Sequence, residues 1–151
     1  MPNQTFAAMT DPESGLIIFN ANDMDLLHYT LDRISHRFKR EMEYDQSGWA
    51  PKGRQIEPGA TGVLFCDAEG RALGGAGIYT NTPYKDVTHM IGWIWIAPPY
   101  RRSGVFSRVL PGLAKRYPGA LINFPYSEAM ERFAGGSPYI VRKFGLLYLI
   151  D

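Results

Sequence analysis

Residues 91–110 of the chain read IGWIWIAPPYRRSGVFSRVL and carry its clearest structural pattern. The first six residues are apolar or glycine, and the β-branched and aromatic side chains among them predict a buried strand. A short proline-bounded loop rich in arginine, serine and glycine follows, and a helical pattern begins at Gly104. A loop that feeds a helix in this way turns unpaired backbone N–H groups toward one point, which attracts an anion, most often a phosphate. We therefore expect an anion site between the strand and the helix.

The length and composition indicate one globular domain, residues 1–151. A hydrophobic content of 45% is ordinary for a soluble protein with a buried core. The net charge of +1 argues against a nucleic-acid-binding protein, which normally carries a clear basic excess. The single cysteine, Cys66, excludes an intrachain disulfide and a cysteine-rich metal site, and its apolar neighbours favour a buried thiol. Neither a basic leader nor a run of about 18 apolar residues is present, so we expect a cytoplasmic protein without a membrane partner.

The first third of the chain predicts one strand and one long helix. Residues 1–14 are polar and are expected to form a flexible arm. A strand at 15–19 should lead into a helix that Asn22 or Asp23 caps and that ends near Tyr44. Apolar residues spaced by three or four along this helix predict its buried face: Met24, Leu27, Leu31, Ile34, Phe38 and Met42.

Two further expectations concern the histidines of this helix and the loop that follows it. His28 and His36 lie off the stripe, so we expect both to be solvated. Residues 45–60 are interrupted by glycine and proline and predict an irregular loop. Trp49 in this loop could contact a substrate or pin the loop to the core, and pinning is the expectation.

A β-hairpin is predicted next. Segments 61–66 and 71–79 are apolar and flank the turn DAEG at residues 67–70. Glycines in the second strand suggest a bulge or the close approach of another backbone: Gly74, Gly75 and Gly77.

The second half of the chain should alternate strands and helices. The key strand is expected at residues 87–96, and the helix after Gly104 should reach Tyr117 with a kink or a short first segment at Pro111. Strand alternation would turn Val87, His89, Ile91, Trp93 and Trp95 to one face. The remaining expected elements are a strand at 120–124, a short helix at 127–133 capped by Ser127 and broken by Gly135-Gly136, a helical turn at 138–143 and one last strand at 146–150.

The segment from Ile96 to Phe106 resembles the acyl-CoA signature of the GNAT acetyltransferase superfamily. In that signature an aliphatic strand end and a proline precede Arg/Gln-x-x-Gly-x-Gly/Ala. Arg101 and Gly104 match it in register, whereas Phe106 replaces the last small residue. The resemblance implies an α/β fold with a central mixed β-sheet and helices on both faces. It also implies acetyl-CoA or coenzyme A as cofactor.

By this resemblance the cofactor is held mainly by backbone groups. Strand backbone at Ile94, Ile96 and Ala97 would pair with pantetheine and present an N–H to the thioester carbonyl. Arg101 or Arg102 could add charge, or both could be solvated turn residues. The pyrophosphate would be bound by the N–H groups of Arg102, Ser103, Gly104, Val105 and Phe106, with the helix dipole behind them.

The catalytic groups are less clearly indicated. Many family members carry a carboxylate base on the central strand, but residues 87–96 contain none, and His89 is the titratable group there. His89 is either the base or a structural residue. Family members also place a tyrosine, as general acid, four residues before the glycine of a Gly-Phe pair. That position is Val141 when counted from Gly145, so Tyr139 and Tyr126 are the candidate acids.

Two functions remain open at this stage. The chain could be an N-acyltransferase that acetylates a primary amine on a small molecule, a peptide N-terminus or a protein lysine. It could instead be a non-catalytic GNAT-like module that binds a protein target and has a retained or decayed CoA site. The tail offers one strand where the family has two, which would leave an open sheet edge for a homodimer partner.

Overall fold

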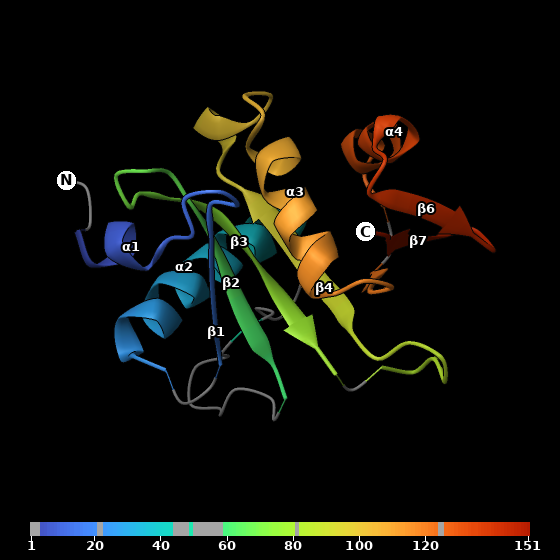
Figure 1. Ribbon diagram of the computed structural model, residues 1–151, viewed down its shortest axis with the longest axis horizontal. Coiled ribbons are helices and arrows are strands. Elements are labelled where there is room, and N and C mark those ends of the chain that lie inside the picture. The colour runs from blue at the N-terminus through green and yellow to red at the C-terminus, as the bar shows by residue number, and fades with distance from the viewer. Residues whose placement is uncertain (1–3, 21–22, 44–48, 50–58, 81, 124–125) are drawn as a thin grey trace.

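The computed structural model describes residues 4–20, 23–43, 49, 59–80, 82–123 and 126–151. The expected α/β fold is confirmed: these residues form one mixed, seven-stranded sheet with helices on both faces (Figure 1). The elements in chain order are α1 (Gln4–Met9), β1 (Leu16–Asn20), α2 (Asp25–Met42), β2 (Thr61–Cys66), β3 (Ala72–Tyr79), β4 (Met90–Ile96), the 3-10 helix η1 (Pro98–Tyr100), α3 (Val105–Arg116), β5 (Leu121–Ile122), α4 (Glu128–Gly136), β6 (Ile140–Lys143) and β7 (Leu146–Leu149).

The strand order across the sheet is β1-β2-β3-β4-β5-β7-β6. The β4–β5 pair is parallel and every other neighbouring pair is antiparallel. Helix α2 packs on β2, β3 and β4, while α3 crosses the opposite face (Figure 1). Two apolar cores result, one on each side of the sheet. The α2-side core includes Phe19, Leu27, Leu31, Trp93 and Trp95, and the α3-side core includes Val63, Ile91, Leu110, Leu113 and Leu147.

A β-bulge at Gly92 corrects the predicted faces of the central strand. Ile91 pairs with Ile78, but the next pair toward the strand end is Trp93 with Gly77, so Gly92 is an extra residue. The bulge turns Ile91 into the α3-side core and Trp93 into the α2-side core, although strict alternation would place both on one face. Sequence periodicity alone could not locate this insertion.

The glycines of β3 are explained by close contacts, as expected. A Cβ atom at Gly74 would lie 2.2 Å from the carbonyl oxygen of Trp95, and one at Gly75 would lie 2.6 Å from Leu31 Cδ1. Neither position has room for a side chain. In α3, Gly112 has the same role, because a Cβ there would lie 2.6 Å from Ser14 Cβ. The absence of a side chain at Gly112 therefore lets α3 pack closely on the segment before β1. Helix α3 includes Pro111 and is not divided there.

The N-terminal segment differs from the predicted arm. Residues Gln4–Met9 form α1, and the Phe6 side chain is 3% exposed within the α2-side core. An amphipathic single turn is too short to give a periodic signal, which is why the sequence suggested a loose start. Helix α2 begins after Met24, and the carboxylate of Asp23 instead accepts a hydrogen bond from the N–H of Asn20. The alternative cap, Asn22, lies outside the described residues.

His28 is not solvated as predicted. Its ring packs edge-on to Phe19 and stacks on Trp49 at 6.0 Å between centroids, and both ring nitrogens are buried. Trp49 is 2% exposed, so the expected pinning of this tryptophan is confirmed. The rest of the predicted loop at 45–60, apart from Gly59 and Ala60, lies outside the described residues. His36 is half-exposed and lies 3.5 Å from the carboxylate of Asp32.

The C-terminal part contains one strand more than predicted. Residues 140–143, expected as a helical turn, form β6 and pair with β7 through a two-residue turn. The alternation of this short segment is too brief to distinguish strand from helix. The predicted missing strand is therefore wrong, and β6 is the edge of the sheet. Ser127 caps α4 as expected by accepting the N–H of Met130, but α4 continues through Gly135 and Gly136.

Candidate functional site

Strands β4 and β5 separate shortly after they meet. Their pairing comprises Met90 with Leu121 and Ile91 with Ile122, and it ends where the N–H of Asn123 donates to the Ile91 carbonyl at 3.0 Å. In the described part of the chain nothing pairs with this side of β4 beyond that bond. The separation exposes a row of main-chain groups along β4.

The register of β4 shows which of these groups face the opening. The N–H of Ala97 donates to the Leu73 carbonyl on the β3 side at 2.9 Å. Because a strand alternates its N–H groups, those of Ile94 and Ile96 point away from β3, toward the opening. Two of the three residues expected to bind pantetheine are therefore suitably placed. Ala97 is not, since its N–H is used within the sheet.

The segment after β4 forms a concentrated set of N–H donors. Helix η1 leads to a turn in which Arg102 and Gly104 have positive φ angles of 60° and 84°. Among the described residues, none accepts a hydrogen bond from the N–H groups of residues 102–107. Left-handed backbone within such a turn and the first turn of α3 together direct N–H dipoles outward. A side chain at Gly104 would project into open space beside them.

The two arginines of this loop have different environments. Arg101 donates from Nε to the Ile96 carbonyl at 2.7 Å and from Nη2 to both carboxylate oxygens of Glu41 at 2.8 and 2.9 Å. Its guanidinium also lies 5.7 Å from the centre of the Trp95 ring. Arg101 thus ties the loop to α2. Its charge is paired with Glu41 and is not directed at the N–H groups of residues 102–107, where it was expected to add charge for a phosphate. Arg102 is exposed and leaves its charge available.

The remaining residues of the predicted cofactor segment support the loop. Ser103 donates its hydroxyl hydrogen to the Tyr100 carbonyl, which closes the turn. Val105 and Phe106 are half-buried at the start of α3, and the Phe106 ring lies 4.8 Å from that of Phe133 in α4. The large side chain that replaces a small residue of the signature therefore packs between two helices.

Comparison with known proteins identifies this architecture. No protein-family model and no curated protein matches the sequence. Solved structures do match, however. The xEco2 acetyltransferase domain bound to a CoA conjugate has a TM-score of 0.58 at 12% identity, over 78% of this chain and 83% of that one. A GNAT-family acetyltransferase from Staphylococcus aureus Mu50 has a TM-score of 0.55 at 10% identity, over 89% and 98%. The chain has the GNAT acetyltransferase fold.

A third match is an acetyltransferase whose name states its substrate class. An aminoglycoside acetyltransferase from an uncultured soil metagenomic sample aligns with a TM-score of 0.52 at 16% identity, over 80% of this chain and 85% of that one. The TM-scores of these matches establish the fold. The sequence identities are too low to establish the activity, which has to be argued from the residues.

Tyr126 is the expected acid that lies closest to the diverging strands of this GNAT fold. Its hydroxyl donates to the Ile122 carbonyl at 2.7 Å and accepts the N–H of Leu147 at 2.9 Å, so it bridges β5 and β7. Burial raises the pKa of this phenol above its ordinary value of 10.0. At neutral pH the group is therefore a protonated donor.

The other two catalytic candidates lie at the opposite end of the sheet. Tyr139 precedes β6, and its carbonyl accepts the N–H of Ile150. His89 precedes β4, packs against Tyr117 at the end of α3, and approaches the Thr88 hydroxyl at 3.3 Å. Five residues of strand separate His89 from Ile94, which corresponds to about 16 Å. The structure does not bring the three candidates together.

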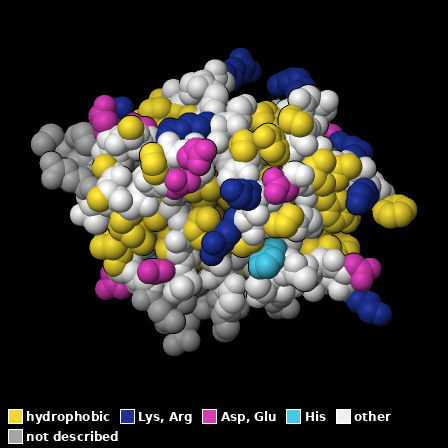
Figure 2. All heavy atoms as spheres, in the orientation of Figure 1, with side chains coloured by type: hydrophobic (Ala, Val, Ile, Leu, Met, Phe, Trp, Pro, Cys, Tyr) yellow, Lys and Arg dark blue, Asp and Glu magenta, His cyan; other side chains and the backbone are white. Residues whose placement is uncertain are grey.

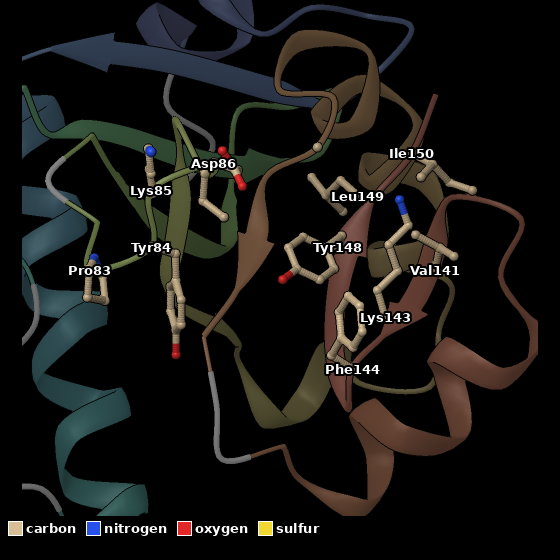
Figure 3. Close-up of a pocket in the computed structure, with 12 residues that line it drawn as sticks. Pro83, Tyr84, Lys85, Asp86, Val141, Lys143, Phe144, Tyr148, Leu149 and Ile150 are labelled. Atoms are coloured by element: carbon tan, nitrogen blue, oxygen red, sulfur yellow. The ribbon is translucent and has the colours of Figure 1, made fainter.

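Two features of the site were not found from the sequence. One is Glu41, which holds Arg101 from a position 60 residues away. The other is a trough of about 600 Å³ on the α2 side of the C-terminal hairpin (Figure 3). Its lining is assembled from the loop before β4, the turn before β5 and the β6–β7 hairpin, including Tyr84, Lys85, Asp86, Gly119, Val141, Lys143, Phe144, Tyr148 and Ile150. The dipeptide Phe144-Gly145, followed by the apolar run at 146–150, was the available signal for the hairpin.

Neither a metal-binding cluster nor a membrane-spanning helix is found among the described residues. In these parts of the chain, no group of three or more His, Cys, Asp or Glu side chains could hold a metal ion. Likewise, none of the helices formed by the described residues has the length and apolar character needed to cross a membrane.

Proposed function

We propose that this protein is an N-acyltransferase that takes an acetyl group from acetyl-CoA and transfers it to a primary amine. The observation that carries the proposal is the run of N–H groups at residues 102–107, which have no acceptor among the described residues and lie where β4 and β5 diverge. In a GNAT fold this combination offers one end of the opening to a pyrophosphate and its strand edge to an amide-containing arm. The fold likeness to a domain bound to a CoA conjugate supports the same cofactor.

The residues would divide the chemistry in a simple way. Acetyl transfer replaces the carbon–sulfur bond of the thioester by a carbon–nitrogen bond, while the amine loses one proton and the thiolate gains one. The N–H of Ile94 is suited to stabilise negative charge on the carbonyl oxygen, since it faces the opening without a sheet partner among the described residues. Tyr126 is suited to supply the proton, because it is the protonated phenol near this end of the sheet.

The alternative is a non-catalytic GNAT-like module that binds a protein target and has a retained or decayed CoA site. It is favoured by the position of His89, far from Ile94, and by the commitment of the Tyr126 hydroxyl to a backbone carbonyl. The acyltransferase requires the cofactor loop, whereas a module with a decayed CoA site does not. The two functions also differ in whether an amine is acetylated.

The test is thermal unfolding with acetyl-CoA, CoA and ATP, followed by an amine acetylation assay. At a ligand concentration of about one hundred times Kd, stabilisation should be about 2.7 kcal/mol for both CoA species. Gly104→Ala should abolish this shift, because its β-carbon would occupy the open space beside the N–H groups that the pyrophosphate has to fill, at a φ angle of 84° that alanine rarely adopts. Gly119→Ala is the matched control, since Gly119 has a similar positive φ angle of 82° and equally open surroundings.

Three results would be informative. A CoA shift lost only in Gly104→Ala, with amine acetylation, supports the acyltransferase. The same shift without acetylation of any amine favours the binding module. No shift at millimolar CoA would contradict the acyltransferase and favour a module with a decayed CoA site.

A further inference from the structure

One half of the α2-side face of the sheet is not covered by α2. Paired residues run across this face in the order Tyr79, Met90, Leu121, Tyr148 and Val141. Helix α2 packs on β2, β3 and β4, and the hairpin β6–β7 is packed against α4 on the opposite face. The trough lies on the uncovered half, over β5 and the hairpin (Figure 3).

The walls of the trough are largely aromatic and aliphatic. Figure 3 shows Tyr148 and Val141 on the hairpin side and Tyr84 on the loop side, with β5 between them. Ile150 closes the end next to the chain terminus. Flat apolar walls of this kind favour a ligand with a flat apolar body, because ring faces stack on one another and exclude water.

Phe144, at the other end of the trough, has two unfavourable features at once. Its φ angle is 52°, and a bulky residue in the left-handed region is strained. Its side chain is also fully exposed (101%). Hydrophobic side chains reach the surface over the side of the molecule where the hairpin β6–β7 lies (Figures 1 and 2). With Gly145 at φ 79°, this is a two-residue turn that asparagine would normally occupy. No contact among the described residues compensates for either cost, which points to a ligand that covers the ring.

The Phe144 turn lies at the end of the sheet where the cofactor opening lies. Leu147 pairs with Ile122, which pairs with Ile91. Gly145 lies two residues before Leu147, and the corresponding step along β4 leads from Ile91 past the bulge to Trp93 and Ile94. Gly145 is therefore level with this part of β4. A molecule in the trough can therefore place one end beside the opening while its body extends toward Tyr84.

The charges of the trough restrict the ligand further. Two positively charged side chains, Lys85 and Lys143, and one negatively charged side chain, Asp86, line the trough. Two ammonium groups against one carboxylate disfavour a polycation such as a polyamine. Nearby positive charge also lowers the pKa of an amine and so favours the neutral form that attacks a carbonyl.

We propose that this trough is the acceptor site and that the acceptor is a monoamine with a flat aromatic body, which Tyr148 supports and Phe144 covers. The proposal rests on the acyltransferase function above and names its substrate class. It assigns Phe144 as a residue that determines specificity.

The test uses the full chain, saturating acetyl-CoA, and 2-phenylethylamine and spermidine as acceptors. The wild-type protein should have a kcat/KM at least about tenfold higher for 2-phenylethylamine, corresponding to one buried ring. Phe144→Asn should raise the KM for this amine about tenfold and leave kcat within about twofold, because it removes the ring cover and not the reacting groups. Its Tm should not fall, since asparagine tolerates the turn conformation better than phenylalanine.

Two further variants make the test specific. Tyr29→Ala removes another exposed aromatic ring, on the outer face of α2, and should change neither KM nor kcat. Lys143→Glu should raise kcat/KM for spermidine by relieving charge repulsion. Equal or better use of spermidine by the wild-type protein, or an unchanged KM in Phe144→Asn, would overturn the proposal.

Failure of the underlying function can be recognised separately. If the wild-type protein shows no CoA-dependent stabilisation, the acyltransferase proposal fails. Binding of 2-phenylethylamine is then followed directly by backbone amide NMR. Chemical-shift changes at Leu146 and Tyr148 that are lost in Phe144→Asn would support the trough site, and their absence would reject it.

Discussion

Gly74 is the residue at which β3 comes closest to the backbone of β4. A Cβ there would be 2.2 Å from the Trp95 carbonyl oxygen and 2.9 Å from Ile96 Cα, and neither atom can move without displacing the cofactor strand. Gly74→Ala should therefore lower the free energy of unfolding by about 3 kcal/mol or more. Chemical denaturation measures this. Gly135→Ala in α4 is the control, because it has open space around it and should be neutral or stabilising by up to about 1 kcal/mol. Equal effects of the two substitutions would contradict the close approach.

Tyr126 joins two strands through one oxygen atom. Tyr126→Phe leaves the Ile122 carbonyl and the Leu147 N–H without this partner, so the free energy of unfolding should fall by about 1–3 kcal/mol. If Tyr126 also protonates the thiolate, kcat should fall well below the value explained by the fraction unfolded. Parallel denaturation and turnover measurements separate the two roles. An unchanged kcat at a temperature where the variant is folded would assign Tyr126 to structure alone.

Cys66 gives a pH dependence with a defined sign. Burial raises the pKa of its thiol from 9.0 to about 11, so the folded state keeps a proton that the unfolded state releases between these values. Stability from this group is present below pH 9 and is lost as pH rises toward 11. At pH 10.5 the loss should be about 2 kcal/mol relative to pH 8. Denaturation of wild type and Cys66→Ala at both pH values measures the difference, and parallel pH dependences would contradict the burial effect.

At the scale of elements, the contact of α2 with the cofactor loop depends on one arginine. Arg101 contacts Glu41, the Ile96 carbonyl and the Trp95 ring at once. Both partners of the ion pair are about 40% exposed, so Arg101→Ala should change the free energy of unfolding by less than about 1 kcal/mol. It should nevertheless weaken acetyl-CoA binding about three- to tenfold, since an untethered loop must be ordered on binding.

Calorimetric titration of acetyl-CoA checks this prediction. Arg33→Ala removes the same charge from the outer face of α2 and serves as control. A loss of affinity in both variants would indicate a general charge effect. No loss in Arg101→Ala would mean that the loop holds its shape without the tether.

The elements that the sequence predicted are those with long or strongly patterned signals. The centre of the α2 stripe, the hairpin β2–β3 and the capped start of α4 were recognised because period, turn residues and cap lie within one short stretch. Met24 and Met42, the two ends of the predicted stripe, are instead exposed. The failures were α1, β6 and the bulge at Gly92. Each is short or depends on a partner strand, so tertiary pairing decided what local preference could not.

At the scale of the whole molecule, the two halves of the site differ in how the chain supplies them. The loop proposed to bind the cofactor is contiguous, so residues 102–106 could be named as candidates from the sequence. The tether from Glu41 and the acceptor trough join segments that are distant in the chain. No spacing rule links those segments, because their proximity is a product of the sheet order β4-β5-β7-β6. The catalytic candidates failed to converge for the same reason.

The proposed cofactor site is tested most directly by a backbone amide NMR titration of the full chain with CoA. We predict that the largest chemical-shift changes occur at residues 102–107, whose N–H groups would bind the pyrophosphate, and at Ile94 and Ile96 on the open edge of β4. Ala97, whose N–H is held by Leu73, should change less. Saturation without changes at residues 102–107, or changes confined to another surface, would contradict the proposed cofactor site.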